Sequence, residues 1–354
     1  MRKILIGLLM VATVAFSAVG LAACNEKNPE PPKHEHYYVD GVCVCGDEIE
    51  NYYTEGLVFT KNAELDGYTV TGYTGDSGSV IIPEIYDALP VTTIGADVFI
   101  NKPQVTKIVL PNSLKIIEDY AFWGSAIKSI TLPESLESIG IGAFKDCVKL
   151  ETIYYNAVNC SAISLGLGDD AKDFNAFSGV GSTLDLGTTL YIGKSVKVIP
   201  AYAFSAGYDG AYATNAKLTH VIFEDGSQCE RIGQQAFRDL RYLKTFTFGN
   251  TTALKEIGKE SLAQMGRFTD FSELVIPASV EKIGVRALTM GKHSQDAKPA
   301  KIIFNDIEGW YSTQKIADYD AMQDGTMVDV SKLIDGDKNV FALVPSGHYM
   351  YKSK

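Results

Sequence analysis

The chain has 354 residues, with 32 lysine and arginine side chains against 43 aspartate and glutamate side chains, which gives a formal net charge of −11. Residues 1–23 hold two basic and no acidic side chains, so the remaining chain carries 30 basic against 43 acidic groups, a net charge of −13. An acidic balance without a basic cluster argues against nucleic acid as a partner.

The first residues have the pattern of an export signal. Arg2 and Lys3 precede an apolar run over Ile4–Val19, and the tetrapeptide Leu-Ala-Ala-Cys follows at residues 21–24. This pattern is typical of a secretory signal peptide over residues 1–23, and the run is too short for a lasting transmembrane helix. The tetrapeptide resembles the bacterial lipobox, which implies cleavage before Cys24 and lipid attachment to it, since several acyl chains are needed for stable anchoring. An ordinary secreted protein with a cysteine near the cleavage site is the alternative.

Residues 24–33 are polar and proline-rich, which predicts a semi-rigid tether, and residues 34–50 then form a short element rich in cysteine and histidine. Asp40-Gly41 between two valines favours a two-residue hairpin turn that pairs Tyr38 with Cys43. Alternation along such a hairpin places four metal-ligating side chains on one face: His34, His36, Cys43 and Cys45. Two imidazoles and two thiolates suit a structural zinc ion. A disulfide and a segment without fixed structure are the alternatives.

A degenerate motif recurs along the chain and is clearest in SITLPESLESIGIGAF at residues 129–144. Nine strand-like runs each end at what we call a turn residue, with apolar residues one and three places before it: Pro83, Pro111, Pro133, Asn156, Gly193, Glu224, Gly249, Pro277 and Asn305. Between successive turn residues lies what we call an arm residue: Phe99, Phe122, Phe144, Phe177, Phe204, Phe237, Leu262 and Leu288. Isoleucine stands five places before every arm residue except Phe177, where Lys172 replaces it. A repeat of this period is the signature of a leucine-rich-repeat solenoid.

The shortest spacing is 11 residues from a turn residue to the arm residue (Pro111 to Phe122) and 11 to the next turn residue (Phe122 to Pro133), so the ideal repeat has 22 residues. The segments Asn156 to Phe177 and Phe204 to Glu224 are ten and nine residues longer than the ideal spacing. We expect these insertions to be loops on the scaffold, where repeat proteins often carry function, although neutral variation in loop length explains them equally well.

The repeat at residues 129–147 resembles that of the BspA-like leucine-rich-repeat family of surface proteins. The leader at residues 68–99 resembles the amino-terminal cap and first repeat of that family, and the cysteine–histidine element resembles a segment that often precedes such arrays. The resemblance covers roughly residues 34–310. It implies an α/β repeat solenoid, with a parallel β-sheet on one face, short helical or irregular arms on the other, and β-hairpin caps. On this basis we expect an N-terminal cap at residues 51–78, the repeat array at 79–304 and a C-terminal cap at 305–354.

Residues two and four places before each turn residue should point away from the core of such a solenoid. The nearer column is apolar and aromatic, and its candidate ligand-binding members are Val109, Tyr154, Tyr191 and Ile222. The farther column is polar. An exposed apolar stripe is typical of a contact surface, but Thr, Val, Ile and Tyr are also simply good strand formers. Tyr154 and Tyr191 are the best binding candidates, because rigid aromatic side chains often anchor interfaces.

No catalytic motif stands out, so we predict a protein that is not an enzyme and has no cofactor apart from the possible zinc ion. The family resemblance implies adhesion to a host or bacterial surface protein or glycan, from an extracytoplasmic position with the lipid as the only membrane attachment. A structural envelope protein without a soluble ligand and an unrecognised hydrolase are the alternatives. Cys229 is expected in the core, while a bridge between Cys147 and Cys160 is left open by the spacing.

Overall fold

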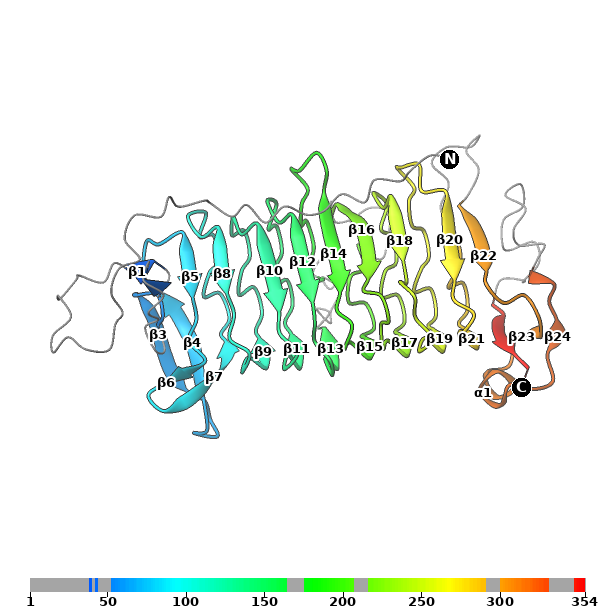
Figure 1. Ribbon diagram of the computed structural model, residues 1–354, viewed down its shortest axis with the longest axis horizontal. Helices are drawn as coiled ribbons and strands as arrows, with labels where there is room; N and C mark the ends of the chain where they lie inside the picture. Colours follow the sequence, from blue (N-terminus) through cyan, green and yellow to red (C-terminus); the bar gives the residue numbers. More distant parts are fainter. Residues whose placement is uncertain are drawn as a thin grey trace, which may run out of the picture.

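The computed structural model describes residues 52–163, 175–206, 216–290, 300–330 and 347–353, and for the backbone alone Tyr38–Val39 and Val42–Cys43. Its repeats stack along one axis into an elongated β-solenoid (Figure 1). One column of strands forms what we call the front sheet, in which every hydrogen-bonded pair is parallel. Its strands are β5 (Ser79–Ile81), β8 (Lys107–Val109), β10 (Ser129–Leu132), β12 (Thr152–Tyr155), β14 (Thr188–Ile192), β16 (Leu218–Phe223), β18 (Thr245–Thr247), β20 (Glu273–Ile276) and β22 (Lys301–Phe304).

The solenoid and its parallel front sheet were predicted and are confirmed, but the returning arms differ in detail from the expectation. Each arm carries a short strand, at the repeated isoleucine in all but the arm of Phe177, where it lies at Ile163. These strands pair in parallel along the solenoid, except that β13 and β15 are not paired. The strands of this second sheet are β7 (Leu89–Ile94), β9 (Ile116–Ile117), β11 (Ser138–Ile139), β13 (Ala162–Ile163), β15 (Val198–Ile199), β17 (Arg231–Ile232), β19 (Glu256–Ile257) and β21 (Lys282–Ile283). The single α-helix of the described residues, α1 (Ile316–Ala321), lies after the repeats. An arm has too few residues between turns to nucleate a helix, so its main chain bonds to the neighbouring repeat instead.

A third ladder of main-chain hydrogen bonds runs along the arm residues. In one repeat, Tyr120, Phe122 and Gly124 donate their N–H groups to carbonyls of the next repeat at 2.9, 2.8 and 2.8 Å. Tyr120 and Gly124 have φ of 55° and 68°, and this left-handed conformation at alternate residues turns all three N–H groups the same way. Tyr202, Gln235 and Arg286 repeat the conformation two residues before their own arm residues. Most repeats are therefore bonded to the next on three sides. The exceptions are β8 and β10, β18 and β20 in the front sheet and β13 and β15 in the second sheet, which do not pair.

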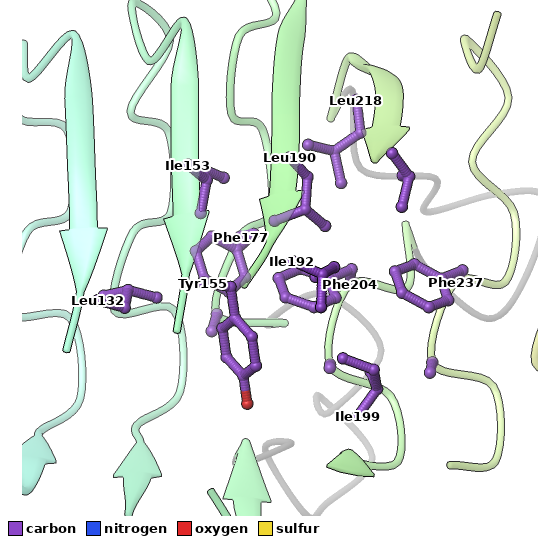
Figure 2. Close-up of a cluster of buried hydrophobic side chains, with 14 of the residues drawn as sticks. Leu132, Ile153, Tyr155, Phe177, Leu190, Ile192, Ile199, Phe204, Leu218 and Phe237 are labelled. Atoms are coloured by element: carbon purple, nitrogen blue, oxygen red, sulfur yellow. The ribbon is translucent and has the colours of Figure 1, made fainter. Parts of the chain in front are cut away.

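The arm residues form the spine of the core. Successive phenylalanine rings lie 5.1–5.5 Å apart between centroids from Phe99 to Phe237, and four of these five contacts are stacked. All eight arm residues are buried, as are the seven isoleucines that precede them. Figure 2 shows the inward side chains of β12 and β14 meeting the arm rings, with Tyr155 reaching from the front sheet towards the second sheet. The predicted core of the repeat is confirmed.

Further strands adjoin both ends of the second sheet. At the N-terminal end, β3 (Leu57–Lys61) pairs antiparallel with β4 (Tyr68–Tyr73), and β4 joins β7, which also pairs with β6 (Ile85–Tyr86). At the other end, β25 (Tyr349–Lys352) pairs antiparallel with β21 and with β23 (Trp310–Thr313), which also pairs with β24 (Thr326–Met327). Part of the C-terminal segment expected as a cap, residues 331–346, lies outside the described residues, and the domain boundaries stay predictions.

Three cysteines of the repeats are buried in the core and form no disulfide: Cys147, Cys160 and Cys229. The bridge between Cys147 and Cys160 that the spacing left open is not formed. The Cys147 Sγ lies 3.1 Å from the Phe122 carbonyl oxygen, to which it donates. Burial raises the pKa of both Cys147 and Cys229 to about 12. These thiols therefore act as small apolar core groups.

The aromatic spine leads to a stability prediction for Phe144→Ala. The Phe144 ring is fully buried and stacks at 5.1 and 5.2 Å on the rings of Phe122 and Phe177, so its removal leaves a cavity shared by two neighbouring repeats. We expect a loss of about 3–5 kcal/mol in the free energy of unfolding, measured by denaturant titration. Leu186→Ala is the matched control, because Leu186 is 77% exposed and its truncation should change stability by less than about 0.5 kcal/mol. If the two changes lowered the free energy of unfolding equally, Phe144 would not be part of a buried aromatic core.

The buried thiols lead to a prediction about chemical reactivity. The thiolate is the nucleophilic form, and a pKa of about 12 leaves very little thiolate at pH 8. In the native protein, Cys147 and Cys229 should resist iodoacetamide at pH 8 and become labelled in denaturant, as measured by peptide mass spectrometry. Rapid labelling of either residue under native conditions would show that its thiol is accessible and not buried in the core.

Candidate binding face

The front sheet brings the predicted outward residues into straight columns. Strand register places Thr131, Tyr154, Tyr191, Ile222 and Thr247 opposite one another across five adjacent strands. We call this line, with Val109 on β8 and Val275 on β20, the apolar column. Its geometry follows from strand alternation, since the intervening residues on each strand are buried in the core.

Two tyrosines stand at the centre of the apolar column. The rings of Tyr154 and Tyr191 are stacked, with centroids 5.1 Å apart and planes inclined by 14°. Tyr154 is 41% exposed, and Tyr191 is partly buried. Val109 is exposed and Ile222 partly buried on the same column, so the structure places all four sequence-predicted residues on one face. Stacking fixes both rings before any partner arrives, which lowers the conformational entropy that binding would cost.

A polar column runs beside the apolar one, through Thr152, Thr189, His220 and Thr245. The His220 Nδ1 lies 2.7 Å from the Thr245 Oγ1. Burial, with a smaller contribution from the nearby positive charge of Lys244, lowers the pKa of His220 below its usual value. The imidazole is therefore mainly neutral near pH 7, and the centre of the face offers hydroxyl, imidazole and aromatic groups without a dominant charge.

The front face is also hollowed, at a place that the sequence analysis did not identify. A hollow of about 860 Å³ lies over β18 and β20 and is lined by Thr245, Thr247, Val275 and the turns that follow the two strands. The segment from Leu262 to Pro277 is 15 residues long against the ideal 11, and this excess was the available signal in the sequence.

The predicted metal and lipid sites lie mainly outside the described residues. The hairpin register is confirmed, because Tyr38 on β1 (Tyr38–Val39) faces Cys43 on β2 (Val42–Cys43). Nothing is described for His34, His36, Cys45 or Cys24, so the zinc set and the lipidation site stay predictions. Within residues that the structure does describe, no group of three or more His, Cys, Asp or Glu side chains is placed to hold a metal ion. A search of the same residues finds no helix with the length and apolarity to cross a membrane.

The repeats are similar to those of known proteins. The family model for the BspA type leucine rich repeat region matches in six copies, at residues 92–166 and 207–302. Among solved structures, a leucine-rich-repeat protein of T. pallidum aligns with a TM-score of 0.32 and 18% identity over 55% of this chain and 80% of its own length. One from Eubacterium ventriosum aligns with a TM-score of 0.35 and 21% identity over 62% of this chain, which spans only 45% of that protein.

A leucine rich cell surface protein of Faecalibacterium prausnitzii aligns over 74% of this chain and 96% of its own length, with 18% identity and a TM-score of 0.24. The search of curated proteins finds no match. The repeat matches and the stacked parallel strands lead to one conclusion: this chain is a solenoid of BspA-type leucine-rich repeats.

Proposed function

We propose that the protein is a lipid-anchored, extracytoplasmic binding protein that attaches to a protein or glycan on a host or bacterial surface without catalysing a reaction. The observation that carries the proposal is the exposed, stacked pair of Tyr154 and Tyr191 at the centre of the front face. Leucine-rich repeats of this kind are generally non-catalytic, and the BspA-like families that contain them are commonly surface or adhesion proteins. Function on such a scaffold depends on the side chains that it displays.

The apolar column supports a contact surface of moderate affinity. The strands at its centre, β12, β14 and β16, are hydrogen-bonded on both sides, so the column is rigid around the two tyrosines. The polar column offers hydrogen-bonding groups beside it, of which the Thr245 hydroxyl and the His220 imidazole already bond to each other. An aromatic centre with polar neighbours matches the usual anatomy of a protein interface, where a few buried aromatic side chains carry most of the binding energy.

The proposed anchor explains how such a face would reach a partner. Lipid at Cys24, followed by the proline-rich residues 25–33, would hold the solenoid near a membrane while leaving its front face accessible. The large acidic excess of the chain disfavours close approach to anionic membrane surfaces, so the anchor and not the solenoid would make the membrane contact.

The binding proposal is tested by Tyr154→Ser combined with Tyr191→Ser. A binding array of matrix proteins, mucins and glycans first identifies a ligand for the full chain. The double change should then weaken binding of that ligand by roughly 2 kcal/mol, which is about 30-fold in Kd. Folding should be nearly unchanged in thermal melts, because both side chains point outward and the buried residues between them are intact.

Thr152→Ala combined with Thr189→Ala is the matched control, because it alters the polar column on the same two strands. We expect this control to bind within a few-fold of the unaltered protein. If the tyrosine variant binds as tightly as the control, the apolar column is well-formed β-structure and not a contact surface.

The anchoring proposal is tested by Cys24→Ala. Lipid attachment needs the cysteine thiol, so the unaltered protein should partition into the detergent phase and the variant should be either unprocessed or released into the aqueous phase. Detergent partitioning is measured after mass spectrometry has established whether residues 1–23 were removed. Equal partitioning of both forms after cleavage would exclude the lipid anchor.

A further inference from the structure

The hollow over β18 and β20 forms a groove on the front face. Its volume of about 860 Å³ falls within the usual range of roughly 300–1,000 Å³ for sites that bind small ligands. The lining begins at Lys244 and Ser272, just before the two strands, and continues to Thr251 and Ser279 in the turns that follow them. The groove therefore has room for a chain-like ligand that lies on the outer surface of the front sheet, along the two strands.

The turn after β20 lacks a contact that other turns make. Two places after the turn residue, several repeats carry a hydroxyl that donates to a carbonyl of the preceding repeat. Ser135 Oγ donates to the Leu114 carbonyl at 2.6 Å, and Thr251 Oγ1 donates to the Ser227 carbonyl at 2.7 Å. Ser279 holds the equivalent position, but its hydroxyl is buried and has no partner among the described residues. A buried hydroxyl without a partner is unfavourable, so this turn is incomplete without a further hydrogen-bonding group.

The front contacts are interrupted more completely here than between β8 and β10, which are also unpaired. Between β8 and β10, the Lys128 N–H donates to the Thr106 carbonyl at 3.1 Å where the strands begin, and Ser135 joins the turn after β10 to the preceding repeat. Between residues 244–252 and 272–279, all of which are described, neither the main chain nor the side chains form a hydrogen bond. The front is therefore open along the whole of β18 and β20.

The hollow has an apolar floor and a rim of short polar side chains. Phe246 and Phe248 line the floor with rings that are almost fully buried, and Val275 adds an exposed apolar side chain beside them. Five exposed side chains that can donate or accept hydrogen bonds form the rim: Thr247, Asn250, Ser272, Glu273 and Asn305. The structure describes all five residues, and none of these side chains has a hydrogen-bond or ion-pair partner within the described chain.

We infer that this hollow binds a short, neutral oligosaccharide. A sugar ring combines an apolar C–H face with a rim of hydroxyl groups, and each hydroxyl both donates and accepts hydrogen bonds. These two surfaces match the apolar floor and the polar rim of the hollow. The charged side chains of the lining are one cation, Lys244, and two anions, Asp225 and Glu273. Neither sign of charge dominates, so the hollow does not favour a strongly charged ligand.

Particular groups of the lining suit the hydroxyls of such a ligand. The Glu273 carboxylate can accept hydrogen bonds from two neighbouring hydroxyls, while the amides of Asn250 and Asn305 can each donate and accept. Rotation about the Cα–Cβ bond of Ser279 would turn its unpartnered hydroxyl towards the hollow that this residue lines. A partner protein would instead need large apolar or aromatic anchors, and Val275 is the largest exposed apolar side chain of the lining.

This inference rests on the non-catalytic binding function proposed above and adds a ligand class to it. It depends on other residues, because the stacked tyrosines lie on β12 and β14 and do not line the hollow. The two proposals can therefore fail separately.

The test is an array of neutral oligosaccharides probed with the full chain, followed by titration calorimetry with each oligosaccharide that binds. Thr247→Arg combined with Val275→Arg, which we call the filled variant, occupies the hollow from two exposed outward positions. Val109→Arg combined with Thr131→Arg is the matched control, because it places the same side chains at the equivalent outward positions of β8 and β10. Circular dichroism melts verify that both variants keep the fold.

A further variant, Glu273→Ala combined with Asn305→Ala, removes hydrogen-bonding groups without filling the hollow. The oligosaccharides should bind the unaltered protein and the control equally, and should bind the filled variant and this further variant at least about tenfold more weakly. Deoxy analogues that lack one ring hydroxyl should also bind more weakly, because a protein group is then left without its partner.

The inference is overturned if no oligosaccharide on the array binds, or if those that bind do so equally to the filled variant and the control. It is also overturned if the filled variant loses a protein ligand while no oligosaccharide binds, because the hollow then serves a protein. Oligosaccharide binding that is lost in Tyr154→Ser with Tyr191→Ser but kept in the filled variant places the sugar on the tyrosines, so the inference fails while the proposed function stands. Binding that survives in the tyrosine variant and is lost in the filled variant supports the hollow.

Discussion

The structure depends on one constraint: each repeat must present the same cross-section to its neighbour in three places at once. Main-chain bonds join most successive repeats in the front sheet, in the second sheet and along the arms. The arm rings repeat at 5.1–5.5 Å, close to the roughly 4.8 Å between paired strands, so ring stacking and strand pairing are satisfied together. Because the inward and arm positions are held by this match, side chains can vary freely mainly on the outward face and in the loops, which is where function can differ between such proteins.

The inward half of this arrangement could be predicted from sequence, because burial selects residue type. The period of the repeat alone predicted which residues are buried: those one and three places before each turn residue and the isoleucine before each arm residue. The alignment of Tyr154 with Tyr191 followed in the same way, since the insertion between their strands leaves the register of β12 and β14 unchanged. Their stacking is a local consequence, because two rings at facing positions of adjacent strands lie within contact distance.

The structure of the arms was harder to predict, because the residue types in the arms do not indicate their main-chain conformation. Left-handed residues are normally indicated by glycine or asparagine, yet this position is occupied by Tyr120, Tyr202 and Arg286. The three main-chain hydrogen bonds that the arms of Tyr120 and Tyr202 each make to the next repeat offset the local strain. The hollow over β18 and β20 was missed for a related reason: Phe246 and Phe248 satisfy the apolar pattern of the other repeats, so their residue types do not show that the two strands are unpaired.

The two candidate contact regions acquire a further property from the rigidity of the solenoid. Tyr191 on β14 and Thr247 on β18 lie on the same outward column with β16 between them, so about 10 Å separates them at the usual strand spacing. A partner that contacts both the tyrosines and the hollow over β18 and β20 would bind the second region at a high effective concentration once the first is occupied. Since the scaffold between them is hydrogen-bonded on three sides, little of that gain would be lost to internal motion. Modest contacts at each region would therefore suffice for firm attachment to one partner, while a ligand that reaches only one region would be held weakly.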